Sequence, residues 1–172
     1  MAAINESIEL MSNKRLNRTI KRMSYQLLEL SQGMDTVLIG LNSRGYHLAS
    51  MIKSVIDEID TVNDPCRHWQ YNVDNEPGSS AELLKKLNGN NFTTFLVDDV
   101  IFSGKTMFNA LKNLNGLEKR STIYTAVLVD RGHRKVPVHA SVTGIEVPTK
   151  LNERVILEFT NEKPGKVILI NN

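Results

Sequence analysis

The chain has 172 residues, of which 41% are hydrophobic and 23% are charged. This composition excludes an intrinsically disordered chain and suits one globular domain, residues 1–172, that buries a sizeable core. The 21 basic and 19 acidic residues nearly balance, so the net charge of +2 gives no reason to expect a polyanionic partner, although it does not exclude a local basic surface.

The N-terminal segment, MAAINESIEL, has early acidic residues and lacks the basic-then-apolar order of a signal peptide. No apolar run reaches the roughly 20 residues that a membrane span needs. Cys66 is the only cysteine, which excludes an intrachain disulfide and fits a reducing compartment. We therefore expect a cytoplasmic protein with no membrane partner.

The first predicted element is an amphipathic helix that starts at Ser12 or Asn13 and stops near Gly33. Its apolar residues recur at alternating steps of four and three, which places them on one helix face: Leu16, Ile20, Met23, Leu27 and Leu30. Basic residues gather on roughly the opposite side: Lys14, Arg15, Arg18, Lys21 and Arg22. A solvated helix face explains such a stripe more often than contact with an mRNA leader does, and both interpretations stay open.

A strand–loop–helix unit follows the first helix. The apolar run Thr36–Leu41 predicts a buried strand, and the helix is predicted over Tyr46–Ile59. Between them, the glycine-containing segment Asn42–Gly45 (NSRG) reads as a loop.

Residues 66–91 are expected to form a small flap or hood. A short strand is predicted at His68–Val73 and a polar helical piece at Ala81–Leu87. Residues 74–80, DNEPGSS, are turn formers throughout. This composition makes 74–91 the best candidate for a mobile flap.

The second half of the chain alternates apolar runs with a helix and a polar loop. The predicted elements are a strand at Phe92–Val97, a helix at Lys105–Leu114 capped by Gly116, a strand at Ile123–Val129, a loop at Arg131–Pro137, and strands at Ser141–Val147, Val155–Phe159 and Val167–Ile170. Because strands alternate with helices along the chain, the predicted fold class is α/β, with a mostly parallel twisted sheet flanked by helices.

Two adjacent acids, Asp98 and Asp99, follow the predicted strand Phe92–Val97. In parallel α/β sheets, ligands bind at the carboxyl ends of strands. The next residues lead to a helix N-terminus, where backbone N–H groups favour a phosphate, and Gly104 removes a Cβ that would block its approach. Carboxylates accept hydrogen bonds from sugar hydroxyls or hold a divalent metal, so a ribose 5-phosphate group satisfies both halves of this segment.

Two other interpretations of the acidic segment are weaker. The sequence GKT suggests a P-loop, but the P-loop pattern needs a glycine where Asp99 stands. The acids can also merely end a strand and cap a helix. Buried strands that end in two adjacent acids are uncommon, which disfavours this second alternative.

Three motifs resemble one known family. Phe95–Met107 (FLVDDVIFSGKTM) resembles the signature of type I phosphoribosyltransferases, in which two acids precede a glycine–threonine loop. Together with Leu38–Ala49 (LIGLNSRGYHLA) and Ala126–Ala140 (AVLVDRGHRKVPVHA), it is similar to the bacterial pyrimidine-operon attenuator proteins, whose members also act as uracil phosphoribosyltransferases. The similarity runs in order from the first helix to Thr149, and residues 66–91 match poorly.

The resemblance implies a binding site for phosphoribosyl diphosphate. Asp98 and Asp99 would hold the 2- and 3-hydroxyls of its ribose. The loop for the 5-phosphate would consist of Phe102, Ser103, Gly104, Lys105 and Thr106. The loop for the diphosphate, which in these enzymes often contains a non-proline cis peptide, would consist of Asn42, Ser43, Arg44 and Gly45. A guanidinium group such as that of Arg44 matches diphosphate oxygens.

The resemblance also implies the catalytic requirements. Mg²⁺ is the implied cofactor, with Asp130 near the Mg²⁺–diphosphate and Arg131 near the ligand. The catalytic set would be Arg44, Asp98, Asp99 and Asp130, because charge develops on the ribose and on the departing diphosphate. The family further suggests a homodimer or a larger homo-oligomer.

Phe102 bears on the acceptor base. Relatives that act on 6-oxopurines carry a carboxylate at this position, and a phenyl ring cannot exchange a proton with the purine. Uracil is therefore favoured, although Tyr71–Asn75 and Gly144–Pro148 depart from the family pattern. Two hypotheses follow: an enzyme that makes UMP and diphosphate, or a nucleotide-sensing regulator that binds the RNA of pyrimidine genes with little turnover.

Overall fold

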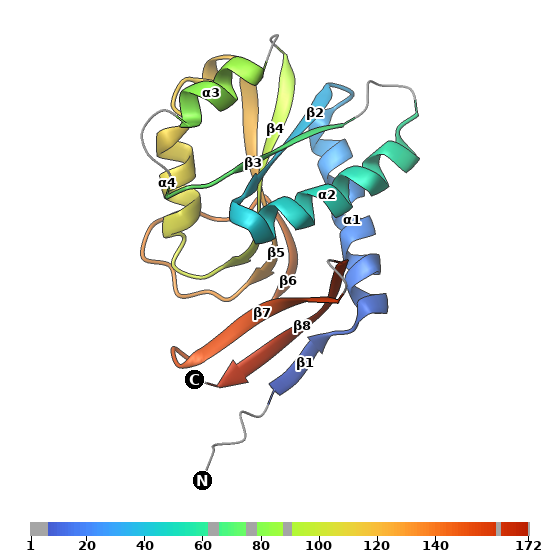
Figure 1. The fold of residues 1–172 in the computed structure, drawn as a ribbon, viewed down its shortest axis with the longest axis vertical. Helices are drawn as coiled ribbons and strands as arrows, with labels where there is room; N and C mark the ends of the chain where they lie inside the picture. Colours follow the sequence, from blue (N-terminus) through green and yellow to red (C-terminus); the bar gives the residue numbers. More distant parts are fainter. Residues whose placement is uncertain (1–6, 62–65, 75–78, 88–90, 161–162, 172) are drawn as a thin grey trace.

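The computed structural model describes residues 7–61, 66–74, 79–87, 91–160 and 163–171, and shows an α/β protein (Figure 1). Its main sheet has five parallel strands in the order β3-β2-β4-β5-β6. These strands are β2 (Asp35–Leu41), β3 (Arg67–Tyr71), β4 (Phe92–Ile101), β5 (Ser121–Asp130) and β6 (Val142–Glu146). The predicted fold class is confirmed.

Helices cover both faces of the main sheet (Figure 1). The described residues form four α-helices, α1 (Asn13–Ser31), α2 (Asn42–Ile59), α3 (Ser79–Lys86) and α4 (Lys105–Asn113), and a 3-10 turn at Leu117–Lys119. The apolar stripes of α1 and α2 pack with Phe95 and Val97 in one core cluster. The opposite cluster joins α3 and α4 to Leu96. Since alternate residues of β4 point to opposite faces, each face of the strand is buried under its own helices.

A second, smaller sheet was not predicted from the sequence. Its three strands, in the order β1-β8-β7, are antiparallel: β1 (Ser7–Met11), β7 (Glu153–Thr160) and β8 (Lys163–Asn171). Met11, Val155 and Val167 bury their side chains in the cluster that also contains α1 and α2. The small sheet, with its strands β1 and β8, thereby packs beside the main sheet (Figure 1).

The helix ends follow the predicted capping chemistry at α1 and depart from it elsewhere. Ser12 caps α1, accepting a hydrogen bond from the Arg15 amide at 3.4 Å, and Gln32 ends the helix in the left-handed conformation. The predicted start of the second helix at Tyr46 is wrong, because α2 begins at Asn42. Gly116 caps the 3-10 turn rather than α4.

The predicted flap at 66–91 is only partly described. Its strand β3 pairs with β2 along the edge of the main sheet, and α3 contacts β3. Residues 75–78 and 88–90 lie outside the described residues, so the mobile flap stays a prediction. Among the described residues, no helix has both the length and the apolar character that crossing a bilayer requires.

Candidate functional site

The carboxyl ends of β2, β4 and β5 lie together, because the three strands are parallel neighbours in the main sheet. Each singled-out motif is found at this edge: Asn42–Gly45 after β2, Asp98–Thr106 at the end of β4, and Asp130–Arg134 at the end of β5. Ligands of open α/β sheets bind at this edge. The structure therefore brings together three segments that are far apart in the sequence.

Asp98 and Asp99 belong to β4 itself rather than to the loop after it. The ladder between β4 and β2 ends at Val97, whereas the ladder to β5 continues to Ile101. The predicted strand end at Val97 is therefore wrong, since pairing with β5 extends the strand. Both acids are buried, with exposures of 9% and 8%, at the point where β2 has already ended.

Burial gives the acidic pair unusual proton affinity. Removal from water raises the pKa of Asp98 well above its usual range, and the negative charge of Asp99 raises it further. Burial also raises the pKa of Asp99, against the opposing effects of a hydrogen bond with Asp98 and the charge of Arg44. The Asp98 Oδ1 atom accepts the Asp99 amide at 2.9 Å, which is a backbone bond rather than a cationic partner. The pair thus retains acceptor capacity for a ligand.

Arg44 approaches the acidic pair from the first turn of α2. Its Nη1 atom lies 3.9 Å from the Asp99 Oδ2 atom, and the Arg44 side chain is 45% exposed. Of the basic side chains in the described residues, Arg44 alone lies within ion-pair distance of either acid. A contact this long and this exposed contributes little to stability, so the guanidinium is available to an anion.

Two glycines allow the N-terminus of α2 to press against the sheet. A Cβ atom on Gly45 would lie 2.4 Å from the carbonyl oxygen of Val97 and 3.3 Å from the Cα of Asp98. A Cβ atom on Gly40 would lie 2.3 Å from the Cα of Tyr46. Any side chain at Gly45 would therefore push α2, and Arg44 with it, away from the acids. Gly40 was not singled out from the sequence, although an isolated glycine within a strand pattern signals such an approach.

Asn42 links the start of α2 to the segment after β3. It has a left-handed φ of 56°, and its Oδ1 atom accepts the amide of Val73 at 3.1 Å. Ser43 is exposed beside it. The described residues contain no cis peptide, so the cis bond that the resemblance implied for this segment is absent from them.

The predicted 5-phosphate loop turns into α4 at Gly104. Gly104 precedes the helix with a left-handed φ of 79°, which glycine adopts without strain. Gly104 has no side chain to cap the helix, and Lys105 and Thr106 are exposed in its first turn. Ser103 Oγ accepts the Lys105 amide at 3.4 Å, a long hydrogen bond. The next amides of α4 have no side-chain acceptor in the described structure, which suits an anion site.

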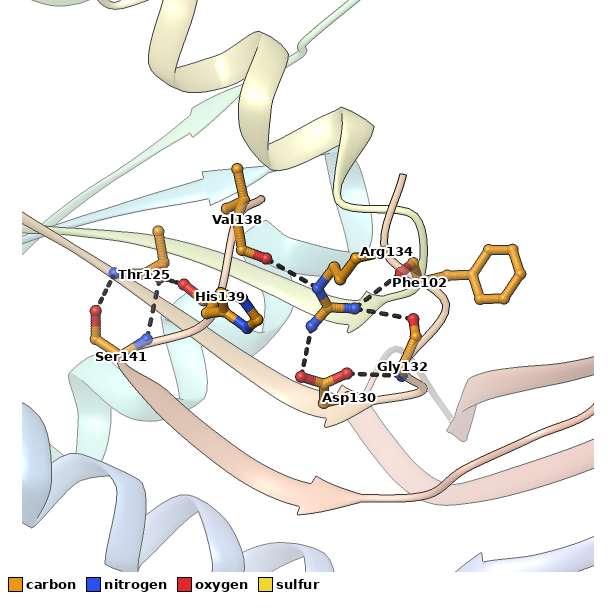
Figure 2. Close-up of polar contacts among 8 residues, drawn as sticks. All are labelled: Phe102, Thr125, Asp130, Gly132, Arg134, Val138, His139 and Ser141. Carbon is orange, nitrogen blue, oxygen red and sulfur yellow. Dashed lines mark hydrogen bonds and ion pairs between the residues drawn. The ribbon is translucent and has the colours of Figure 1, made fainter. Parts of the chain in front are cut away.

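Asp130, the last residue of β5, differs from the acids of β4 in having protein partners. Its Oδ2 atom pairs with Arg134 Nη2 at 2.5 Å, and its Oδ1 atom accepts the Gly132 amide at 2.8 Å (Figure 2). Its predicted place beside Mg²⁺ and diphosphate stays a prediction. In such a role, both carboxylate oxygens of Asp130 would already accept hydrogen bonds from the protein.

Arg131 is buried and occupied by the protein. Its Nε atom donates to Thr149 Oγ1 at 2.9 Å, and Nη2 donates to the carbonyl of Glu153 at 2.5 Å. Its guanidinium carbon lies 4.3 Å from the ring centre of Phe102, whose other neighbour is the His133 ring at 5.2 Å. Phe102 therefore serves as a platform for Arg131, and the guanidinium binds the turn before β7 rather than pointing into open space.

Comparison with known proteins identifies the family. Residues 8–159 match the family model described as a phosphoribosyl transferase domain. The chain belongs to the phosphoribosyltransferase family. A protein of Leuconostoc mesenteroides named bifunctional protein PyrR is 34% identical over 167 residues, covering 92% of this chain and 94% of that protein. A protein of the same name from Leuconostoc citreum is 35% identical over 156 residues, covering 86% and 88%.

Solved structures agree with the family at the level of the fold. The hypoxanthine phosphoribosyltransferase of Trypanosoma cruzi superposes with a TM-score of 0.71, and the match covers 95% of each chain. Its sequence identity is 16%, so this likeness concerns the fold alone.

The acidic pair fits the Mg²⁺ that phosphoribosyltransferases generally use. Mg²⁺ is usually held by one or two carboxylates together with substrate phosphates and water, rather than by a full set of protein ligands. Within the described part of the chain, no group of three or more acids, histidines or cysteines could hold a metal ion. Asp98 and Asp99 supply two carboxylates near the Gly104 turn, the predicted 5-phosphate loop, which suits a metal that arrives with the diphosphate.

Some functional contacts could not be found from sequence patterns. Arg134 donates hydrogen bonds to three backbone carbonyls as well as to Asp130, but its spacing from Asp130 only suggests a helix pair in a segment that is not helical. His133 and Thr149 were likewise not assigned to Phe102 and Arg131. Only the conspicuous DRGHR motif marked this region in advance.

Proposed function

We propose that this phosphoribosyltransferase transfers the ribose 5-phosphate group of phosphoribosyl diphosphate to a pyrimidine, with uracil as the acceptor, giving UMP and diphosphate. The proposal depends on one observation above all. The buried pair Asp98 and Asp99 stands directly before the Gly104 turn and the N-terminus of α4, with Arg44 opposite. This arrangement offers hydroxyl acceptors, phosphate donors and a cation within one edge of the sheet.

The acidic pair would bind the 2- and 3-hydroxyls of the ribose. Each hydroxyl can donate to a carboxylate oxygen, and a hydrogen bond to a charged group contributes about 1.5–3 kcal/mol. Such bonds favour the ionised carboxylates, so ligand binding opposes the raised pKa of Asp98 and Asp99. The energy that burial costs the empty site would be partly recovered in the complex.

The turn after β4 would bind the 5-phosphate. The N-terminal amides of α4, and the hydroxyls of Ser103 and Thr106, are donors suited to phosphate oxygens. Lys105 is exposed and adds a positive charge at the same helix end. Because the acidic pair and the phosphate-binding turn would lie on one continuous segment, the ribose between them would be held in a fixed orientation.

Departure of the diphosphate builds negative charge on the leaving group and positive charge on the ribose. Arg44, exposed near Asp99, is placed to stabilise the leaving group, and Asn42, Ser43 and Gly45 line the same turn. Bound Mg²⁺ would add further stabilisation of the diphosphate. Asp98 and Asp99 lie where negative charge can stabilise the sugar.

Phe102 supports a pyrimidine acceptor. The resemblance places a carboxylate at this position in relatives that act on 6-oxopurines. Here the position is a phenyl ring that lies under the Arg131 guanidinium and makes a tilted contact with the His133 ring. The relatives named PyrR, and the resemblance to attenuator proteins that act as uracil phosphoribosyltransferases, favour uracil. We place the reaction in the cytoplasm and expect a homodimer or larger assembly.

A direct assay tests the enzyme hypothesis. Purified protein is incubated with phosphoribosyl diphosphate, Mg²⁺ and uracil, and UMP is measured by chromatography. Hypoxanthine and guanine serve as matched acceptors. UMP formation that exceeds purine nucleotide formation supports the proposal, whereas purine nucleotides as the main product would overturn the choice of base. No product with any acceptor would favour the regulator.

The exposed basic residues of α1 support a second candidate, the RNA-binding regulator. Arg15 donates to the carbonyl of Leu10, and Arg22 donates to the carbonyl of Gly144 at 2.5 Å. Arg15 and Arg22, two of the predicted RNA contacts, therefore already donate hydrogen bonds to backbone carbonyls of the protein. Three exposed cations remain on the stripe, each without a recorded polar partner in the described structure: Lys14, Arg18 and Lys21.

Charge reversal separates the two functions. The double variant Lys14→Glu and Arg18→Glu should weaken binding to the leader RNA of a pyrimidine operon at least about tenfold, since phosphate contacts dominate such binding. The measurement is a gel shift with and without UMP. UMP synthesis should be unchanged, and an equal loss of both activities would refute this division of roles.

A further inference from the structure

Arg134 holds the loop after β5 against the loop after β4. Its Nη1 atom donates to the carbonyls of Phe102 at 2.8 Å and Gly132 at 3.0 Å, and its Nε atom donates to the carbonyl of Val138 at 2.8 Å. Its Nη2 atom pairs with Asp130 at 2.5 Å. Figure 2 shows the guanidinium at the centre of these partners. One side chain therefore joins the end of β5, its following loop and the turn that leads into α4.

The residues next to Arg134 support the back of the same turn. The carbonyl of Ser103 accepts the amide of Lys135 at 2.9 Å, and the amide of Val136 lies 3.4 Å from it. A Cβ atom on Gly104 would lie 3.1 Å from Val136 Cγ2. Residues 134–136 therefore pack against one side of the turn.

The far end of the loop after β5 is also fastened. Thr125 Oγ1 donates to the carbonyl of His139 at 2.9 Å and accepts the amide of Ser141 at 3.1 Å, as Figure 2 shows. The loop is thus fixed to β5 at both ends, by Asp130 through Arg134 and by Thr125 through Ser141. It is a rigid support rather than a free connection.

We propose that Arg134 is a positioning residue for the 5-phosphate: it fixes the Phe102–Gly104 turn to Asp130 and thereby aligns the N-terminal amides of α4. The identity of the ligand rests on the proposed function, whereas the support of the turn does not. The N–H groups of Arg134 bind groups of the protein, so Arg134 contacts no reacting atom. Asp130, in turn, acts by holding Arg134.

The chemistry of guanidinium explains why arginine is needed here. Its planar group has five N–H donors in a fixed fork, so it can reach three carbonyls and a carboxylate together. A lysine offers one compact charge, which could pair with Asp130 but could not also reach the carbonyls of Phe102 and Val138. Loss of Arg134 would leave the partly buried carbonyls of Phe102 and Val138 without this donor.

Kinetics with phosphoribosyl diphosphate test this role. A loosened phosphate grip weakens the ground state and the transition state alike, so KM should rise with little change in kcat. For Arg134→Gln and for Arg134→Lys we expect KM for phosphoribosyl diphosphate to rise roughly tenfold, with kcat within about threefold of wild type. If Arg134→Lys restores wild-type KM, charge neutralisation of Asp130 is sufficient and the positioning role is refuted.

The matched control is Arg120→Gln. Arg120 also donates to two carbonyls, of Leu87 at 2.9 Å and Leu84 at 3.1 Å, but it precedes β5 at the opposite end of the strand. Its loss should lower thermal stability without raising KM. An equal rise in KM for both arginine variants would mean that general destabilisation, not alignment of the turn, is responsible.

Amide hydrogen exchange separates the support from the proposed function. Without any ligand, peptides that cover residues 102–108 should exchange at least about tenfold faster in Arg134→Gln than in wild type, and at the wild-type rate in Arg120→Gln. Unchanged exchange would overturn the positioning role even if the enzyme is active. Faster exchange in a protein that does not bind phosphoribosyl diphosphate would preserve the support and remove the proposed ligand.

Discussion

The acids at the ends of β4 and β5 are neighbours with opposite surroundings. Asp130 has an arginine partner at 2.5 Å and a backbone donor at 2.8 Å, so its charge is satisfied by the protein. Asp98 and Asp99 are more deeply buried, and Arg44 is 3.9 Å from the nearer of them. Asp130 therefore helps to hold its own loop, whereas a hydrogen-bonding ligand could stabilise the charges of Asp98 and Asp99.

This difference distinguishes binding from support among acids that look alike in the sequence. An ion pair with extra hydrogen bonds is complete, and removing one partner is destabilising. A buried pair with a raised pKa is costly to the fold and persists where function requires it. The comparison supports the proposal that Asp98 and Asp99 bind the ligand, whereas Asp130 holds its loop.

The largest expected effect is on ligand affinity. Asp99→Asn should weaken the binding of phosphoribosyl diphosphate roughly 100-fold, because it removes a charged acceptor for a ribose hydroxyl. Asp130→Asn should weaken it less than about tenfold, through the position of the turn alone. Titration calorimetry at saturating Mg²⁺ measures both. Equal losses in the two variants would break the contrast between the strands.

The next effect concerns the contact between α2 and β4. Gly45→Ala should destabilise the protein by about 2–3 kcal/mol, because the new Cβ would lie against the carbonyl of Val97 and force the helix away. Chemical denaturation gives the free energy of unfolding. Gly33→Ala is the control in open space, where only the left-handed φ is strained. A Gly45 variant as stable as wild type would mean that α2 does not press on the acids.

The smallest expected effect is on the free energy of unfolding, which should change in opposite directions in Asp98→Asn and Asp130→Asn. Asp98→Asn should raise the free energy of unfolding at pH 7 by about 1–3 kcal/mol, because it removes a carboxyl that is costly to bury. Asp130→Asn should lower it by about 1–2 kcal/mol, since Arg134 loses its charged partner.

The pH dependence of stability tests whether the raised pKa of Asp98 causes the stability gain expected for Asp98→Asn. A carboxyl with a raised pKa keeps its proton in the folded state after the unfolded chain has lost its own, near pH 4. The folded state then binds more protons, so wild-type stability falls as pH rises above about 4. The advantage of Asp98→Asn should therefore grow from pH 4 to pH 7. An advantage that is the same at both values would exclude the protonation explanation.

The fold was largely predictable because its strong signals are local. The helical spacing of Leu16 to Leu27 and the apolar run of β2 each specify their element within a few residues. The second sheet could not be found in this way, because β1 pairs with β8 from the other end of the chain. Short strands of that kind have no local signal for their partner.

The part of the site that lies within one short segment of the sequence was predictable. The order of Asp98, Asp99 and Gly104 indicated a sugar and a phosphate together. The start of α2 at Asn42 was missed because NSRG has turn composition, and only the close approach of Gly45 explains a helix there. Several partners of Arg131 and Arg134 are backbone carbonyls, which no side-chain pattern reveals.

We propose that phosphoribosyl diphosphate binds at an acidic pair whose pKa values are raised by burial when the site is empty. Calorimetric titration of wild type with the Mg²⁺-saturated ligand at pH 7, in two buffers of different ionisation enthalpy, measures the protons exchanged on binding. We predict binding with net proton release, since ribose hydroxyls favour the ionised carboxylates, and a smaller release in Asp98→Asn, which lacks the carboxyl whose pKa burial raises most. Binding heats that are independent of the buffer, or no binding at all, would contradict the account.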